Sequence, residues 1–200
     1  MKKLTLGLIL LLSFSAVATA QGDAAAGEAK AAVCGACHGV DGNSMISSFP
    51  KLAGQNVRYL VKQMQDIKNG DRAAPTMTGL LANSSDQDMQ DIAAYFSSQT
   101  VKLGTAKAEL VALGEQLYRS GSKRKGVSAC SACHSPTGSG NAPAGYPSLK
   151  GQHAAYTAAQ LKAFRASERH NDADKIMRDN AELLSDKDIE ALASYISGLR

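Results

Sequence analysis

Two short clusters of cysteine and histidine are the residues of this chain whose types and spacing could do chemistry. CGACHG at 34–39 and CSACHS at 130–135 each place two cysteines three residues apart, with a histidine directly after the second. On one helical turn, side chains at i, i+3 and i+4 share a face, so each cluster presents two thiols and one imidazole together. Such a trio could form disulfides, bind zinc, act as a redox dithiol or attach a larger cofactor.

The spacing C-x-x-C-H is that of a covalent c-type haem site, in which two thioethers hold the ring and the histidine binds the iron. A structural zinc site needs a fourth protein ligand, and His153 could supply one only in the second half. No βαβ pattern surrounds either cluster, as a thioredoxin-like dithiol would require, and disulfides leave both histidines unexplained. We therefore expect two covalently bound haem c groups. Their attachment residues are Cys34, Cys37 and His38 in the first cluster, and Cys130, Cys133 and His134 in the second.

The chain is a repeated unit, because segments around the two clusters match in the same order. The matched segments are FPKLAGQ (49–55) with YPSLKGQ (146–152), SDQDMQDIAAYFSS (85–98) with SDKDIEALASYISG (185–198), and Tyr59 and Gln63 with Tyr156 and Gln160. We expect two homologous lobes at 21–100 and 109–200, joined by a linker at 101–108.

The elements that position the clusters are all expected to be helices. Apolar residues at helical spacing predict a helix that begins near Asn56, and its counterpart begins near Ala154. A last helix follows Ser85 or Ser185, where S-D-x-D provides an N-cap and first-turn acids. Alanine-rich helices near 24–33 and 107–120 precede the clusters, and no segment has a convincing strand pattern. The fold class is therefore all-α.

The sixth iron position can be assigned by comparing the methionines of the two halves, since methionine commonly fills it in electron-transfer cytochromes. After residue 100 the only methionine is Met177. In the first half Met64 and Met89 align with core positions of the second half, and Met45 lies only seven residues after the cluster histidine. Met77 is left, in the same place before the last helix as Met177.

Two further histidines, His153 and His170, compete as iron ligands. The first half has no histidine besides His38, so neither belongs to the repeated design. We expect both on the solvated surface, and we expect the axial pairs to be His38 with Met77 and His134 with Met177.

The first twenty residues, MKKLTLGLILLLSFSAVATA, have the basic start, apolar stretch and small-residue end of a secretory signal. We expect cleavage before Gln21 and a periplasmic protein, the alternative being an uncleaved anchor. Without Lys2 and Lys3 the net charge falls from +4 to +2, which argues against nucleic acid as a partner.

Composition supports a bound apolar group, since tryptophan is absent and aromatic residues make up only 5% of the chain. Charge is unequal, with 7 basic and 8 acidic residues in 21–104 against 13 and 10 in 105–200. The segment RSGSKRKGVSA at 119–129 is longer than its counterpart and carries Lys123, Arg124 and Lys125. It is either a solvated loop or a docking patch for an acidic partner.

Together the paired CxxCH motifs, FPKLAGQ and YPSLKGQ, the two late methionines and the paired SDxDxxxxAxY endings resemble the di-haem cytochrome c4 family. The resemblance implies two class I cytochrome c lobes that face one another across a pseudo-twofold interface. It also implies a periplasmic electron carrier, soluble or loosely membrane-associated, with no small-molecule substrate. The implied partners are a quinol-oxidising complex of the cytochrome bc1 type and a terminal oxidase.

The resemblance also implies that the carbonyls of Pro50 and Pro147 accept a hydrogen bond from the histidine ligands, although both prolines could instead only shape their loops. It further implies contacts of Gly27 with Tyr95 or Phe96, and of Gly114 with Tyr195.

Two other functions fit similar lobes. One is the electron-accepting cytochrome subunit of a periplasmic dehydrogenase, with catalysis on another chain. The other is a di-haem peroxidase, which would need a site where substrate reaches the iron, and methionine at both irons argues against it. We therefore expect an electron carrier and not an enzyme.

Overall fold

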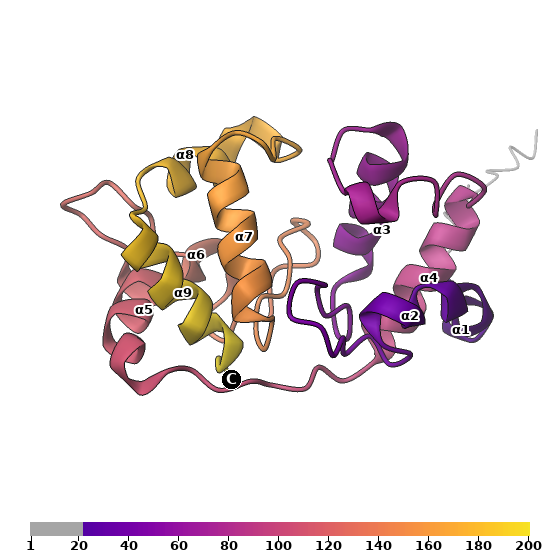
Figure 1. Ribbon diagram of the computed structural model, residues 1–200, viewed down its shortest axis with the longest axis horizontal. Helices are drawn as coiled ribbons and strands as arrows, with labels where there is room; N and C mark the ends of the chain where they lie inside the picture. The colour runs from indigo at the N-terminus through magenta and orange to yellow at the C-terminus, as the bar shows by residue number, and fades with distance from the viewer. Residues whose placement is uncertain (1–21) are drawn as a thin grey trace, which may run out of the picture.

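Helices provide the regular structure of both halves of the chain in the computed structural model, which describes residues 22–200 (Figure 1). The first half contains α1 (Ala24–Lys30), η1 (Ala31–Val33), α2 (Gly35–His38), α3 (Val57–Asn69), η2 (Pro75–Met77) and α4 (Asp86–Ser98). The second half contains α5 (Ala108–Ser120), α6 (Ser131–His134), α7 (Ala154–Arg165), η3 (Ala173–Lys175), α8 (Ile176–Glu182) and α9 (Asp186–Ser197). Between residues 22 and 200 the only β-pairing is two isolated antiparallel bridges, so the all-α prediction is confirmed.

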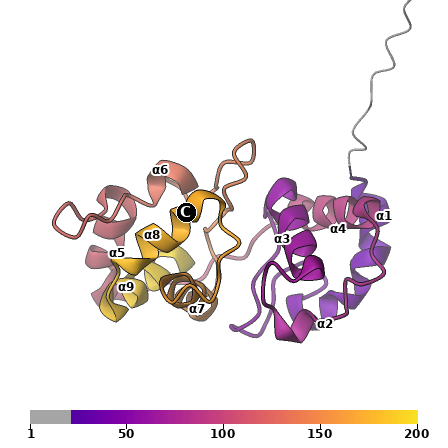
Figure 2. The ribbon, with the colours of Figure 1, turned by 90° about the horizontal axis from the view of Figure 1, so that it is seen from above.

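The two halves form two lobes that lie side by side, and an extended segment after α4 connects them (Figures 1 and 2). The precise lobe and linker boundaries given above stay predictions. The expected export signal at 1–20 lies outside the described residues. Among the helices that the structure describes, none has the length and apolar character needed to cross a membrane.

Local sequence signals set the helix ends. Ser85 and Ser185 begin α4 and α9 with capping boxes, in which the serine hydroxyl accepts from the Asp88 or Asp188 amide and that aspartate accepts from the serine amide. In α3 the Asn56 side chain caps the first turn through the Tyr59 amide at 2.8 Å. The expected helix starts near Asn56 and after Ser85 and Ser185 are therefore confirmed.

Each lobe has its own apolar core, and the first and last helices of each lobe also cross at close range. A Cβ added to Gly27 would lie 2.0 Å from the Asp91 carbonyl oxygen, and one added to Gly114 would lie 2.4 Å from the Ala191 carbonyl oxygen. Only glycine allows helices to approach this closely. The aromatic neighbour of Gly27 is Tyr95, whose Cβ lies 3.0 Å from the added Cβ, while Phe96 is buried in the core.

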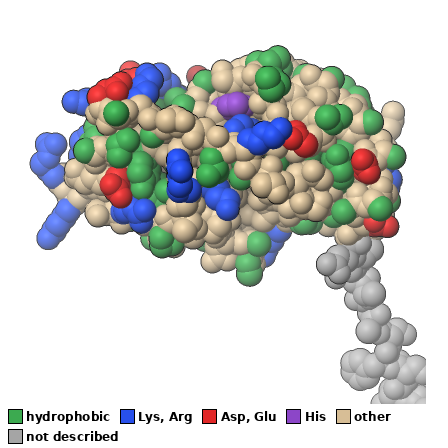
Figure 3. Space-filling view, turned by 90° about the horizontal axis from the view of Figure 1, so that it is seen from below, with side chains coloured by type: hydrophobic (Ala, Val, Ile, Leu, Met, Phe, Trp, Pro, Cys, Tyr) green, Lys and Arg blue, Asp and Glu red, His purple; other side chains and the backbone are tan. Residues whose placement is uncertain are grey.

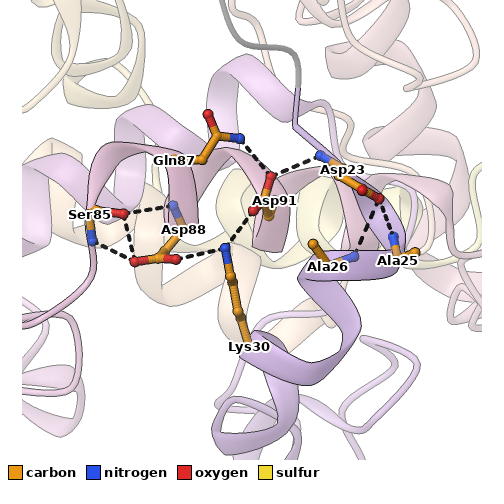
Figure 4. Close-up of polar contacts among 8 residues, drawn as sticks. All are labelled: Asp23, Ala25, Ala26, Lys30, Ser85, Gln87, Asp88 and Asp91. Atoms are coloured by element: carbon orange, nitrogen blue, oxygen red, sulfur yellow. Dashed lines mark hydrogen bonds and ion pairs between the residues drawn. The ribbon is translucent and has the colours of Figure 1, made fainter.

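A lysine ties the first helix of the first lobe to its last helix (Figure 4). The Nζ atom of Lys30 lies 2.7 Å from Asp88 Oδ1 and 2.6 Å from Asp91 Oδ2. Asp91 also accepts from the amide of Asp23, the residue that caps α1, at 2.9 Å. This network fixes α1 against the N-terminal half of α4.

In the second lobe the matching cation comes from the longer segment that precedes the second cluster. Lys125 forms an ion pair with Asp188, whose side chain is only 5% exposed. Lys125 is therefore an ion-paired residue and not a freely solvated one, whereas Lys123 and Arg124 are exposed. On the face shown in Figure 3, basic side chains are more numerous over the second lobe than over the first.

Replacing Lys125 with methionine should destabilise the second lobe by about 2 kcal/mol at pH 7, because the buried Asp188 carboxylate loses its cation. Burial raises the pKa of Asp188, but Lys125 and Ser185 outweigh burial and hold that pKa below its usual value. The ion pair therefore stabilises the fold fully above the pKa of an unfolded aspartate, about 4, and less as the pH falls through the lower folded pKa. Urea unfolding should show that the difference in unfolding free energy between wild type and variant is smaller at pH 3 than at pH 7.

The exposed Lys123 provides the control, since Lys123→Met should change the unfolding free energy by less than about 0.5 kcal/mol. An equal loss in both variants, or a gap that does not depend on pH, would show that the ion pair is not the cause.

Candidate haem-binding sites

The first cluster forms a single helical turn, as its spacing requires. The amides of Cys37 and His38 both donate to the Cys34 carbonyl oxygen, at 3.2 and 2.9 Å. Cys34 is half-buried and Cys37 is exposed, and both thiols are free. The turn is held between the end of η1 and Gly39, which has φ 78°.

The second cluster repeats this turn. The amides of Cys133 and His134 donate to the Cys130 carbonyl oxygen at 3.3 and 2.9 Å, and both thiols are free and half-buried. Burial raises the pKa of the Cys130 thiol to about 11 and also raises the pKa of Cys34. Raised thiol pKa values disfavour the thiolates that a zinc site or a reactive dithiol would use, whereas a thioether carries no charge.

The two cluster histidines have the same geometry. Nδ1 of His38 lies 2.9 Å from the Pro50 carbonyl oxygen, and Nδ1 of His134 lies 3.0 Å from that of Pro147. A carbonyl can only accept, so Nδ1 carries the proton and Nε2 keeps its lone pair. Burial lowers the pKa of both histidines, which favours the neutral, metal-binding form.

Neither Nε2 atom has a hydrogen-bond partner among residues 22–200, although both histidine residues are only 6% exposed. A buried imidazole with a fixed tautomer and an unused lone pair is suited to bind a metal. The residues present therefore fit a haem in each lobe.

The methionines differ in their surroundings. Met77, at the end of η2, is half-buried and packs against the first core, and Met177 is half-buried in the first turn of α8. Met64 and Met89 belong to the first core itself. Met45 is 94% exposed on a loop. Met45, Met64 and Met89, which the sequence comparison excluded as iron ligands, thus lie in the core or on the surface.

One histidine prediction was wrong. His153 is not a solvated residue, because its Nε2 lies 2.9 Å from Ser44 Oγ and 3.0 Å from the Ser44 carbonyl oxygen, across the boundary between the lobes. His170 is exposed, as expected. The sequence did contain one signal for His153. It follows GQ in the second half as Asn56 follows GQ in the first, so it occupies a matched position of the repeat.

A reciprocal pair of glutamines joins the lobes next to the two histidine-proline loops. The Gln55 side chain donates to the Ser148 carbonyl oxygen and accepts from the Ser148 amide, both at 2.8 Å. The Gln152 side chain does the same with the carbonyl and amide of Lys51, both at 2.9 Å. Ser148 and Lys51 directly follow Pro147 and Pro50, so these bonds relate the two lobes by an approximate twofold axis.

Two arginines extend this symmetry between α3 and α7, which face one another in Figure 1. Arg72 donates to Gln63 of its own lobe at 2.8 Å and to the Tyr156 hydroxyl of the other lobe at 2.8 Å. Arg169 donates to Gln160 of its own lobe at 2.7 Å and to the Tyr59 hydroxyl at 3.2 Å. The matched tyrosines and glutamines of the repeat are thus interface residues, a function that sequence comparison had not assigned.

Comparison with known proteins agrees with this geometry. The family model described as cytochrome c matches twice, at residues 24–100 and 111–200. The chain is 59% identical to cytochrome c4 of Pseudomonas aeruginosa over the whole of both chains. It is 35% identical to the thiosulfate dehydrogenase electron acceptor of Stutzerimonas stutzeri, over 84% of this chain and 80% of the relative.

The fold is also similar to a solved structure. The crystal structure of reduced recombinant cytochrome c4 from Pseudomonas stutzeri superposes with a TM-score of 0.88 and 57% identity. The match covers 90% of this chain and all of the solved chain.

Proposed function

We propose, from the premise that this chain belongs to the cytochrome c4 family, that it carries single electrons in the periplasm from a quinol-oxidising complex to a terminal oxidase. Membership implies two covalent haem c groups and a function in electron transfer with redox protein partners. The quinol-oxidising complex, the terminal oxidase and the periplasmic location are proposed. The leader-like sequence of residues 1–20 supports export.

The single observation that carries the proposal is the pair of histidines, each held by a proline carbonyl and each with a free Nε2. We assign His38, Met77, His134 and Met177 as the residues that would bind the two irons. We assign thioether bonds to Cys34, Cys37, Cys130 and Cys133. Each bound haem supplies an iron that exchanges one electron between its ferrous and ferric states.

The residues of the chain set the conditions for that exchange. The carbonyls of Pro50 and Pro147 fix the imidazole rings and strengthen their donor character. If Met77 and Met177 also bind the irons, no coordination position would be open to a substrate, which supports a carrier and not a peroxidase.

A second function is favoured by a specific observation, the 35% identity to a protein named as a thiosulfate dehydrogenase electron acceptor. In that case the chain would take its electrons from a dehydrogenase, with catalysis on another chain. The two lobes would need no change, because only the donor differs.

The test is stopped-flow reduction and oxidation of the purified di-haem protein. We expect rapid reduction by a quinol-oxidising complex, rapid oxidation by a terminal oxidase, and no turnover of hydrogen peroxide. Fast reduction by thiosulfate dehydrogenase alone would favour the second function. Peroxide turnover at a rate matching a peroxidase would overturn both.

A further inference from the structure

A buried carboxylate holds the segment that carries Met177. Oδ2 of Asp172 accepts from the amides of Met177 and Arg178, each at 3.0 Å. Oδ1 accepts from the Arg178 Nε at 2.8 Å. The Asp172 side chain is only 5% exposed, so these three bonds form away from water and close the backbone between 172 and 178 into a tight loop.

The loop that Asp172 closes is strained. Asp174 and Lys175 both have left-handed backbone conformations, with φ 51° and φ 58°, which side-chain-bearing residues rarely adopt. Such strain persists only where surrounding contacts hold the segment in place. The three bonds to Asp172 are contacts of this kind, and without them the loop would relax and displace Met177.

The start of the same loop is anchored to the other lobe. The side chain of Asn171 donates to Gln63 Oε1 at 3.0 Å and to Asp66 Oδ2 at 2.6 Å, and its carbonyl accepts from Lys62 at 3.0 Å. The Met177 segment therefore runs from a fixed interface residue directly into the Asp172 loop.

The Met77 segment of the first lobe also follows an interface residue, Arg72, but no carboxylate of the described residues closes it into a loop. Residues 73–83 form successive backbone turns, including those from Met77 to Ala74 and from Leu80 to Met77. Among residues 22–200 no side chain of that segment makes a hydrogen bond with a protein group. Apolar packing of Met77 and Leu81 against the first core is what holds it.

We propose that Asp172 is a positioning residue that holds Met177 on its iron and makes it the less readily displaced of the two methionines. This inference rests on the proposed assignment of Met77 and Met177 as ligands. The physical reason is a population effect: an added ligand binds only when the methionine segment is open, so its apparent affinity scales with the open fraction. Closing the loop with Asp172 lowers that fraction in the second lobe alone.

The experiment is titration of the oxidised di-haem protein with imidazole, followed by loss of the weak methionine–iron charge-transfer band. In the wild type we expect two steps, the weaker one belonging to the second lobe. Asp172→Ala should raise the affinity of the weaker step at least tenfold and leave the stronger step unchanged. Arg178→Ala removes only the guanidinium bond and should therefore give a smaller shift in the same direction. This variant provides the test if Asp172→Ala does not fold.

Asp179→Asn is the matched control, because Asp179 lies exposed on α8, the helix that carries Met177, and its side chain makes no hydrogen bond within residues 22–200. It should leave both steps unchanged. Loss of thermal stability in Asp172→Ala with both steps unchanged would show a merely structural function and overturn the inference, as would a single step in the wild type.

Met177→Ala separates this failure from failure of the ligand assignment. If Met177→Ala removes the band of one haem while Asp172→Ala has no effect on the titration, only the inference fails. If Met177→Ala leaves both bands intact, the assignment itself is wrong.

Discussion

Replacing Met177 with alanine should open one of the two irons and leave the other closed. Alanine cannot reach the iron, so the variant should lose the methionine–iron charge-transfer band of one haem and bind one carbon monoxide per chain when reduced. Met77→Ala should do the same at the other haem, and the double variant should bind two. Absorption spectra of the oxidised protein and titration of the reduced protein with carbon monoxide measure both effects.

Two methionine controls test whether the effect is specific. Met45→Ala should change nothing, because Met45 is 94% exposed. Met89→Ala should lower stability by about 3 kcal/mol through a cavity in the first core, since Met89 is fully buried, yet it should leave both irons closed. Carbon monoxide binding in Met89→Ala but not in Met77→Ala would contradict the ligand assignment.

Adding a single methyl group at either helix crossing should strongly destabilise the lobe concerned. Gly27→Ala would put Cβ 2.0 Å from the Asp91 carbonyl oxygen, and Gly114→Ala would put it 2.4 Å from that of Ala191. Backbone cannot give way as a flexible side chain can, so the helices must separate. We expect a loss of about 3 kcal/mol in each variant, measured by urea unfolding followed by circular dichroism.

Glu28→Ala is the control for Gly27→Ala, because Glu28 is the next residue of α1 and is exposed. It should change the unfolding free energy by less than about 0.5 kcal/mol. A cost for Gly27→Ala no larger than that of Glu28→Ala would mean that the α1–α4 crossing is looser than the structure shows.

The interface between the lobes gives the two sites a common frame. Gln55 and Gln152 bond to backbone directly after the two prolines that orient the histidines. Arg72 and Asn171 bond across the interface shortly before the two methionine segments. Both sides of each proposed iron site are therefore connected to the other lobe within a few residues.

The charge environment of this interface affects one tyrosine in particular. Burial raises the pKa of Tyr59, but the positive charges of Arg169 and Arg72 outweigh burial and hold that pKa below its usual value. The two arginines thus favour electron density on the Tyr59 hydroxyl oxygen, which accepts the hydrogen bond from Arg169.

The sequence by itself determined those features that depend on neighbours along the chain. The CxxCH turns, the capping boxes at Ser85 and Ser185 and the all-α class all follow from spacing within a few residues. The repeat also predicts Met77 and Met177 as iron ligands, because comparing matched positions separates a residue shared by both halves from a core residue such as Met89; this assignment stays a proposal. Local geometry and internal homology carry this information without any knowledge of the fold.

Only the tertiary structure decided which residues meet across long separations. His153 contacts Ser44 at a separation of 109 residues, and Lys125 contacts Asp188 at a separation of 63. Helical periodicity and composition contain no record of such pairs, since they form only when the lobes and loops dock. Asp172 lies just five residues from Met177, yet its bond to that amide depends on left-handed backbone at Asp174 and Lys175. No glycine marks that turn, so the strain that shapes it is visible only in three dimensions.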